Sequence, residues 1–301
     1  MLYKSILFLA ILTIALAATP ISTINSIRKK SGATTLTYSK KLSVAAYKHA
    51  YYVSKSSLLG HYEDSSYNYF YGSAPWDRVL RAGFGTAVVV ENISFYEKNY
   101  RASIRKLMGT VYHRLAFLTL EVDSIGYATV GRIYVYDMSN SKVAALCKKH
   151  YKNAPMVING VCPNSSDIIP ENLFKSAMWK MKSKAKSVIM YPYRNQKGVG
   201  VRGVEESPKF LNRLFGYPVS VTFNSIYASK VVLKSFKLFK GAKVVSGKIV
   251  TSRSDTHKKI KPNTFVFAPD RYLSPASTYR VKVVALVNGK RKVVEWSFST
   301  R

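Results

Sequence analysis

Val88-Val-Val-Glu-Asn-Ile-Ser94 predicts a strand that is buried over most of its length, yet it carries a carboxylate, Glu91, followed by an amide, Asn92. Three consecutive valines without polar alternation are typical of a strand covered on both faces. A carboxylate in such a place needs hydrogen-bond or charged partners. We therefore expect other polar segments to meet this strand in one cleft.

Two further segments supply histidines, one before this strand in the chain and one after it. Leu58-Leu-Gly-His-Tyr62 contains His61, and Leu107-Met-Gly-Thr-Val-Tyr-His-Arg114 contains His113. Two imidazoles and a carboxylate are a set that Zn²⁺ accepts while one coordination position stays open. We predict a divalent-metal site on His61 and His113, with Glu91 as acidic ligand, orienting group or catalytic base. The alternative is that the histidines lie at the surface or at helix ends and that Glu91 binds backbone N–H groups.

Neighbours of these three residues are the predicted ligand contacts: Tyr62, Asn92 and Tyr112. For Asn92, a bond to the backbone is the competing interpretation. His49 differs from His61 and His113 because it lies on the apolar stripe of a predicted helix that Ser39 caps. We expect His49 to be a hydrogen-bonded core residue and not a metal ligand.

Residues 21 to about 140 alternate predicted helices with short strands, which favours a layered architecture of mixed helices and strands. The motifs along this stretch, in order, resemble bacterial members of the CAP superfamily (cysteine-rich secretory protein, antigen 5 and pathogenesis-related proteins). The motifs that carry the resemblance are Ile24-Asn-Ser-Ile-Arg28, Leu42-Ser-Val-Ala-Ala46, Gly60-His61, Trp76-Asp-Arg78, Ala82-Gly-Phe84, Glu91-Asn-Ile-Ser94, Leu107-Met108, His113-Arg114 and Asp123-Ser-Ile-Gly126.

This resemblance implies an α/β fold, a three-layer α-β-α sandwich with a central cleft. His61 and His113 match the family's metal-binding histidines, and Glu91 matches the acid of its Glu-Asn motif. One position departs from many eukaryotic members, which carry a second glutamate on the helix before the later histidine. Thr110 stands near that place here, as Ser or Thr often does in bacterial members. A two-carboxylate hydrolytic mechanism through that position is therefore put in doubt.

The domain organisation that we predict has four parts. Residues 1–17 have the basic start, apolar run and small residues of a cleaved signal peptide. Residues 20–140 form the CAP-like domain and residues 141–205 a basic connector. Residues 206–301 contain strand-like runs between turn signals such as Asn288-Gly289, which predicts a smaller all-β sandwich. Its last strands resemble those of bacterial immunoglobulin-like modules.

The cysteine usage agrees with export from the cytoplasm. Cys147 and Cys162 are the only two cysteines and lie fifteen positions apart within the connector. A disulfide between them would close a loop worth up to about 3 kcal/mol. Two free thiols are the alternative.

The charge is strongly basic, with 47 Lys and Arg against 15 Asp and Glu and a net charge of +32. In a cytoplasmic chain this balance would favour a nucleic-acid partner. The predicted signal peptide favours a secreted or periplasmic protein instead, so we expect no nucleic acid. Its expected partners are anionic envelope components, or an apolar or glycan ligand in the cleft. The competing interpretation is a general basic bias without a specific anionic ligand, because the basic residues are dispersed along the chain. No transmembrane segment is expected after signal cleavage, because no other apolar run approaches about twenty residues.

Two functions remain open at this point. The first is an exported, non-enzymatic binding module whose cleft holds a divalent metal, zinc being the candidate, and an envelope or extracellular ligand. The second is a zinc-dependent hydrolase acting on peptide or cell-wall material through His61, His113 and Glu91. The sequence contains no Gly-x-Ser-x-Gly elbow and no phosphate-binding glycine loop. We favour the first function, because no general base is left if Glu91 binds the metal.

Overall fold

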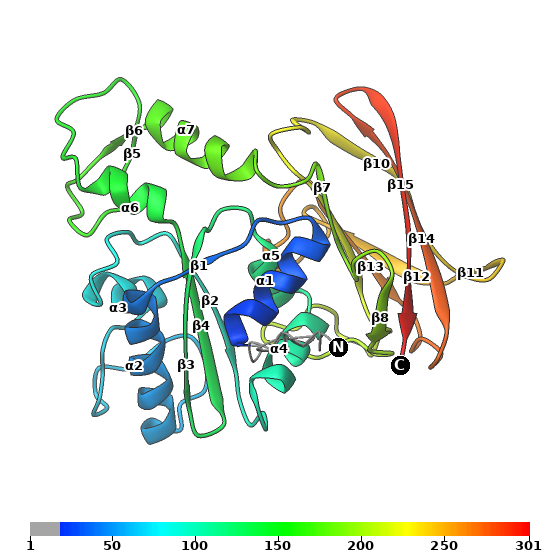
Figure 1. Ribbon diagram of the computed structural model, residues 1–301, viewed down its shortest axis with the longest axis horizontal. Helices are drawn as coiled ribbons and strands as arrows, with labels where there is room; N and C mark the ends of the chain where they lie inside the picture. The colour runs from blue at the N-terminus through cyan, green and yellow to red at the C-terminus, as the bar shows by residue number, and fades with distance from the viewer. Residues whose placement is uncertain (1–18) are drawn as a thin grey trace, which may run out of the picture.

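A computed structural model describes residues 19–301, so the predicted signal peptide at residues 1–17 lies outside the described residues. The chain forms three parts (Figure 1). We call residues 20–139 the α/β region, residues 141–182 the disulfide lobe and residues 188–300 the β region. Within residues 19–301, no helix has the length and apolar character needed to cross a membrane.

The α/β region is built on a four-stranded sheet with helices on both faces (Figure 1). In sheet order its strands are β1 (Thr37–Tyr38), β3 (Ser124–Val130), β4 (Ile133–Ser139) and β2 (Val89–Ser94). On one face lie α2 (Lys40–Ser56) and α3 (Pro75–Arg81), and on the other lie α1 (Pro20–Ser31), α4 (Tyr100–Gly109) and α5 (Tyr112–Leu118). The predicted α/β architecture of this region is confirmed.

Helix α2 lies unusually close to the sheet, and a glycine makes this approach possible. Ser39 caps the helix, and Leu42, Ala45, Ala46, Ala50 and Val53 are buried at helical spacing. A Cβ atom on Gly126 of β3 would lie 2.1 Å from the backbone nitrogen of Ser43. The start of α2 therefore depends on glycine at this position of the strand.

The disulfide lobe follows the sheet and contains α6 (Ser141–Cys147), β5 (Val157–Ile158), β6 (Ile169–Pro170) and α7 (Glu171–Lys182). Cys147 and Cys162 form the predicted disulfide, with Cα atoms 5.3 Å apart. Because the bond joins the end of α6 to the long loop after β5, it closes a lobe that has little apolar core of its own.

The β region consists of two sheets that share a core. One has the strand order β11 (Lys243–Val245), β10 (Val231–Lys240), β14 (Thr278–Val287), β15 (Lys290–Thr300) and β8 (Gln196–Val199). The other has the order β12 (Gly247–Thr251), β13 (Thr264–Pro269), β9 (Val219–Phe223) and β7 (Val188–Tyr191). The expectation of a largely β C-terminal region is confirmed. Strands β7 and β8 come from the segment expected to be a connector, and the turn at Asn288-Gly289 has positive φ at both residues, as predicted.

The β region packs directly against α4 and α5, and one continuous apolar core runs through both regions. Arg114 of α5 shows how close this contact is. Its buried guanidinium donates to the carbonyl oxygen of Pro218 at 2.6 Å and lies between the rings of Tyr191 and Tyr217, with centroid distances of 4.8 and 5.0 Å. Tyr217 in turn donates to the carbonyl oxygen of Met108 at 2.9 Å. The β region is thereby fixed beside the helices that precede and carry His113.

Candidate functional site

Glu91 lies on β2 as predicted, and its buried carboxylate joins two partners. Oε1 is 2.8 Å from Nδ1 of His61, and Oε2 accepts a hydrogen bond from Nη2 of Arg78 at 2.8 Å. Burial alone would raise the pKa of Glu91, but the hydrogen bond from His61 and the charges of His49 and Arg78 outweigh it and lower the pKa to about 2. Glu91 is therefore ionised at neutral pH and can only accept, so Nδ1 of His61 carries the proton.

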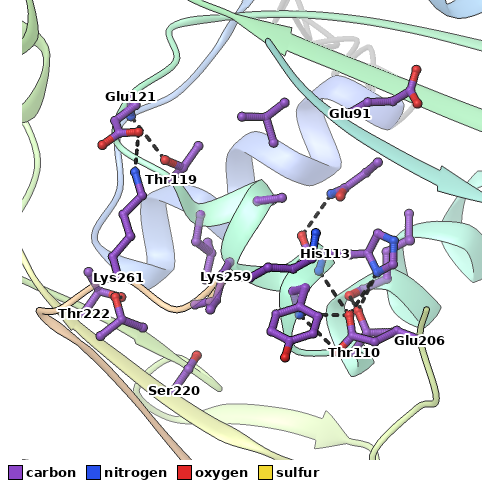
Figure 2. Close-up of a pocket in the computed structure, with 18 of the residues that line it drawn as sticks. Glu91, Thr110, His113, Thr119, Glu121, Glu206, Ser220, Thr222, Lys259 and Lys261 are labelled. Carbon is purple, nitrogen blue, oxygen red and sulfur yellow. Dashed lines mark hydrogen bonds and ion pairs between the residues drawn. The ribbon is translucent and has the colours of Figure 1, made fainter. Parts of the chain in front are cut away.

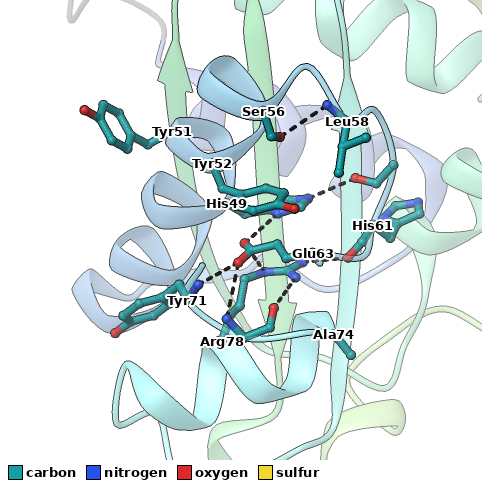
Figure 3. Close-up of polar contacts among 12 residues, drawn as sticks. His49, Tyr51, Tyr52, Ser56, Leu58, His61, Glu63, Tyr71, Ala74 and Arg78 are labelled. Atoms are coloured by element: carbon teal, nitrogen blue, oxygen red, sulfur yellow. Dashed lines mark hydrogen bonds and ion pairs between the residues drawn. The ribbon is translucent and has the colours of Figure 1, made fainter. Parts of the chain in front are cut away.

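A second layer of buried polar residues holds the loop that carries His61 (Figure 3). Arg78 donates to the carbonyl oxygens of His61 at 2.9 Å and of Gly72 at 3.1 Å. His49 bonds Glu63 through Nδ1 and the carbonyl oxygen of Gly60 through Nε2, both at 2.9 Å. His49 is thus a buried, hydrogen-bonded residue. Arg78 contacts both the backbone of His61 and the carboxylate that His61 binds, so it sets the position of one relative to the other.

Asp137 is a further buried carboxyl group next to Glu91, because the two residues are paired across β2 and β4. Neither of its oxygens accepts a hydrogen bond from a neighbouring donor. Burial, and after it the negative charge of Glu91, raise the pKa of Asp137 well above its usual range. The raised pKa favours the protonated form of Asp137 beside the ionised carboxylate of Glu91.

His113 lies in the first turn of α5, and the hydrogen bonds around it define its tautomer (Figure 2). Its Nδ1 is 3.2 Å from Oγ1 of Thr110 and 3.1 Å from Oε2 of Glu206. The Thr110 hydroxyl already donates to the carbonyl oxygen of Leu107 at 2.7 Å, so toward His113 it can only accept. Nδ1 of His113 therefore carries the proton, and Nε2 holds the lone pair.

Asn92 and the two predicted tyrosines occupy different places. The amide nitrogen of Asn92 donates to the carbonyl oxygen of His113 at 2.9 Å, so this side chain holds the backbone of the second histidine. Tyr62 is 66% exposed beside the ring of Trp76. Tyr112 donates to Oδ1 of Asp255 at 2.6 Å, and burial and this carboxylate raise the pKa of its hydroxyl. All three residues line the same cavity as the two histidines. The hydroxyl of Tyr112, however, already donates its hydrogen bond to Asp255.

The rings of His61 and His113 face each other with centroids 6.2 Å apart and an angle of 28° between their planes. In both, a carboxylate lies at Nδ1, which leaves Nε2 as the nitrogen that could bind a metal ion. Two imidazoles on one zinc ion have centroids about 5 Å apart, given Zn–N bonds of about 2.0–2.1 Å. The two ring centroids are about 1 Å further apart than in such a site, and the facing, nearly parallel rings would also have to turn so that both Nε2 lone pairs point at one ion. Within residues 19–301, no three His, Cys, Asp or Glu side chains are grouped so that they could hold a metal ion.

Both histidines line a cavity of about 1370 Å³ between the α/β region and the β region. His113 lies at one end of it (Figure 2). At the other end, Glu121 pairs with Lys261 and with Lys182, the latter at 3.4 Å. Hydroxyl groups of β9 and β13 form the wall there, from Ser220, Thr222 and Thr264. Lys259 lies between the two ends, with Nζ 6.0 Å from the centre of the Tyr112 ring.

Residues 21–134 match the family model described as "CAP: Cysteine-rich secretory protein family". These residues form a CAP domain. Two solved structures are similar to part of the chain. An extracellular protein containing a SCP domain, from Bacillus anthracis str. Ames, is 16% identical over 40% of this chain and 39% of that chain, with a TM-score of 0.37. An outer surface protein from Borrelia burgdorferi is 17% identical over 40% of this chain and 88% of that chain, with a TM-score of 0.35. No curated protein matches the chain.

The boundary of the CAP domain divides the cavity. His61, Glu91 and His113 lie inside it, whereas Glu206, Lys259 and Lys261 come from beyond residue 134. The sequence interpretation missed Glu63, Asp137 and Glu206. For Glu63 a signal existed, since it follows His61 by two residues, but nothing in the sequence around Glu206 connects it with a histidine 93 positions earlier.

Proposed function

We propose that this protein is an exported binding module whose cleft holds a divalent metal ion on Nε2 of His61 and His113 and an envelope ligand in the adjoining cavity, without turning the ligand over. One observation carries the proposal. Both carboxylates beside the histidines are already used at Nδ1, by Glu91 at 2.8 Å and by Glu206 at 3.1 Å. This is the arrangement in which carboxylates orient metal-binding imidazoles, and it leaves neither of them free to act as a general base.

Export is supported by the predicted signal peptide, the disulfide and the charge of +32. We interpret the two sheets of the β region as an immunoglobulin-like sandwich that attaches the CAP domain to the envelope or spaces it from there. The shared core of β9, β13, β10, β14 and β15 supports a sandwich.

The ligand that we propose carries a negatively charged group. Lys182 and Lys261 pair with one acid, Glu121, at the end of the cavity away from the histidines, and Lys259 lies between the two ends. Hydroxyl side chains beside them suit the oxygen atoms of a sugar or phosphate. An anionic wall or envelope glycan combines these groups.

The alternative is a zinc-dependent hydrolase acting on peptide or cell-wall material. The observation in its favour is that two histidines leave several coordination positions for water beside a large cavity. A bound zinc ion would polarise such a water. In that case Glu91 would have to leave His61 to act as base, and its ion pair with buried Arg78 opposes this movement.

The metal claim is tested by zinc titration of the full-length protein in a calorimeter. His61→Ala and His113→Ala should each lose zinc binding. His150→Ala is the matched control, because His150 is an exposed histidine of the disulfide lobe and should bind as the wild type does. A wild-type protein that takes up no zinc at neutral pH would refute the metal site.

The ligand and the absence of turnover are tested with muropeptides and phosphorylated wall polymer. We expect binding without cleavage. The affinity should fall at least tenfold in the double variant Lys259→Ala/Lys261→Ala, and the affinity of the wild type should decrease at high salt. Lys258→Ala, which changes a neighbouring lysine outside the cavity lining, should bind normally. Metal-dependent cleavage that is lost in both His61→Ala and Glu91→Gln would favour the hydrolase instead.

A further inference from the structure

Glu206 belongs to the segment that leads into the β region, yet its side chain is fully buried against the CAP domain. Oε1 accepts from the backbone N–H of Val111 at 2.7 Å, and Oε2 from that of Tyr112 at 2.9 Å. Val111 itself offers no side-chain cap to α5. Glu206 therefore satisfies the first N–H groups of the helix on which His113 lies.

The same carboxylate also meets the ring of that histidine. Oε2 is 3.1 Å from Nδ1 of His113, on the nitrogen that the Thr110 hydroxyl contacts as an acceptor at 3.2 Å. Two acceptors at one nitrogen favour the tautomer with the proton on Nδ1. Only in this tautomer is the Nε2 lone pair available to a metal ion or a ligand N–H group.

The backbone around Glu206 is held in place by contacts with the end of α4. The N–H of Val204 donates to the carbonyl oxygen of Gly109 at 3.2 Å. A Cβ atom on Gly109 would lie 2.6 Å from Cγ2 of Val204, so this approach depends on the missing side chain. Glu206 is thus presented by a segment that fits closely onto the α4–α5 corner.

We propose that Glu206 is a positioning residue, supplied to the CAP domain from outside it, that holds His113 in the tautomer with Nδ1 protonated and completes the site. The CAP domain boundary is therefore not the boundary of the functional site. The consequence for metal affinity rests on the proposed function, whereas the tautomer of His113 can be measured without any metal.

The first test is the long-range ¹H–¹⁵N correlation spectrum of the histidine rings in the full-length, metal-free protein. It is recorded above the pH range in which histidine usually titrates, about 6.5. The wild type should show Nδ1 of His113 protonated. A wild-type spectrum with the proton on Nε2 would overturn the proposal, and this result does not depend on any variant folding.

The second test compares Glu206→Gln with Glu205→Gln, a neighbouring, exposed glutamate that lines the same cavity. In Glu206→Gln the amide oxygen is drawn to the N–H groups of α5, so its NH₂ group faces Nδ1 and favours the other tautomer. We expect the proton of His113 to shift toward Nε2 and zinc affinity to fall about 10- to 100-fold. Glu205→Gln should leave both unchanged.

The outcomes separate this inference from the proposed function. A tautomer shift in Glu206→Gln with no zinc uptake by the wild type would reject the metal site and support the role of Glu206. Wild-type zinc binding that Glu206→Gln retains, together with an unchanged tautomer, would reject the role of Glu206 and leave the metal site standing. Circular dichroism spectra like that of the wild type would show that the variants are folded.

Discussion

Arg78→Met should destabilise the protein far more than a surface arginine replacement does. The substitution keeps a long unbranched side chain but removes the charge paired with Glu91 at 2.8 Å and the donors to the carbonyl oxygens of His61 and Gly72. Removing one partner of a buried ion pair costs about 3–5 kcal/mol. For a chain of this size we expect the melting temperature to fall on the order of 5–10 °C. Arg81→Met is the control, because Arg81 lies on the same helix with an exposed side chain and should cost less than about 1 kcal/mol.

The pH dependence of stability provides a second test of this prediction. The folded-state pKa of Glu91 is lowered to about 2, so its stabilising effect is complete above the unfolded pKa and is lost as the pH falls through about 2. Without Arg78 the folded-state pKa of Glu91 rises toward the unfolded value. The variant therefore loses less stability than the wild type when the pH falls. The difference in stability between wild type and Arg78→Met, measured by urea unfolding, should therefore narrow from pH 6 to pH 3. A difference that is no larger than that of Arg81→Met, or that stays constant over this range, would refute the reasoning.

Three other changes have defined outcomes. Asp137→Asn removes a buried acid whose folded-state pKa is raised, so the wild-type protein loses stability as the pH rises above the unfolded pKa of this acid. The variant should therefore gain stability relative to wild type from pH 4 to pH 7. The opposite trend in urea unfolding would contradict this. Tyr112→Phe removes the bond to Asp255 and should cost about 1–2 kcal/mol in urea unfolding, whereas Tyr62→Phe, at an exposed tyrosine, should cost nothing measurable. Cys147→Ser/Cys162→Ser removes the disulfide, whose closure of the loop stabilises the fold by up to about 3 kcal/mol. Limited proteolysis should then cut the variant first between residues 148 and 168. Equal resistance of wild type and variant would count against a stabilising role of the disulfide.

Much of the CAP domain could be predicted because its signals are local. Ser39 and the apolar spacing after it define α2, the three valines before Glu91 define a buried strand, and the motif order placed both histidines in one cleft. The Asn288-Gly289 turn and the alternating strands likewise indicated the β region. For α2, the buried strand and the hairpin turn, residues close together in the chain determine the conformation, whereas the shared cleft of the two histidines was implied by the family resemblance.

The parts that escaped prediction depend on contacts between distant segments. Strand β7 pairs with β9 and β8 pairs with β15, so a stretch that looks like a basic connector acquires its strands from partners further along the chain. Asp137 could be foreseen on a strand, but its raised pKa depends on its burial in the folded chain and on its register opposite Glu91. The role of Glu206 depends on a fold that places it beside His113, which lies 93 positions earlier in the chain.

This long-range contact changes what Thr110 means for the site. The sequence shows a hydroxyl near the place where related eukaryotic proteins carry a carboxylate, which taken alone suggests that His113 lacks an acidic partner. In the folded chain, the small Thr110 side chain leaves room at Nδ1 for Glu206, and its hydroxyl contacts the same nitrogen. His113 therefore has a carboxylate at Nδ1, as His61 has through Glu91. Each histidine thus has a carboxylate at Nδ1, Glu91 from within the CAP domain and Glu206 from beyond it, and this shared arrangement supports the proposed metal-binding pair over two unrelated polar residues.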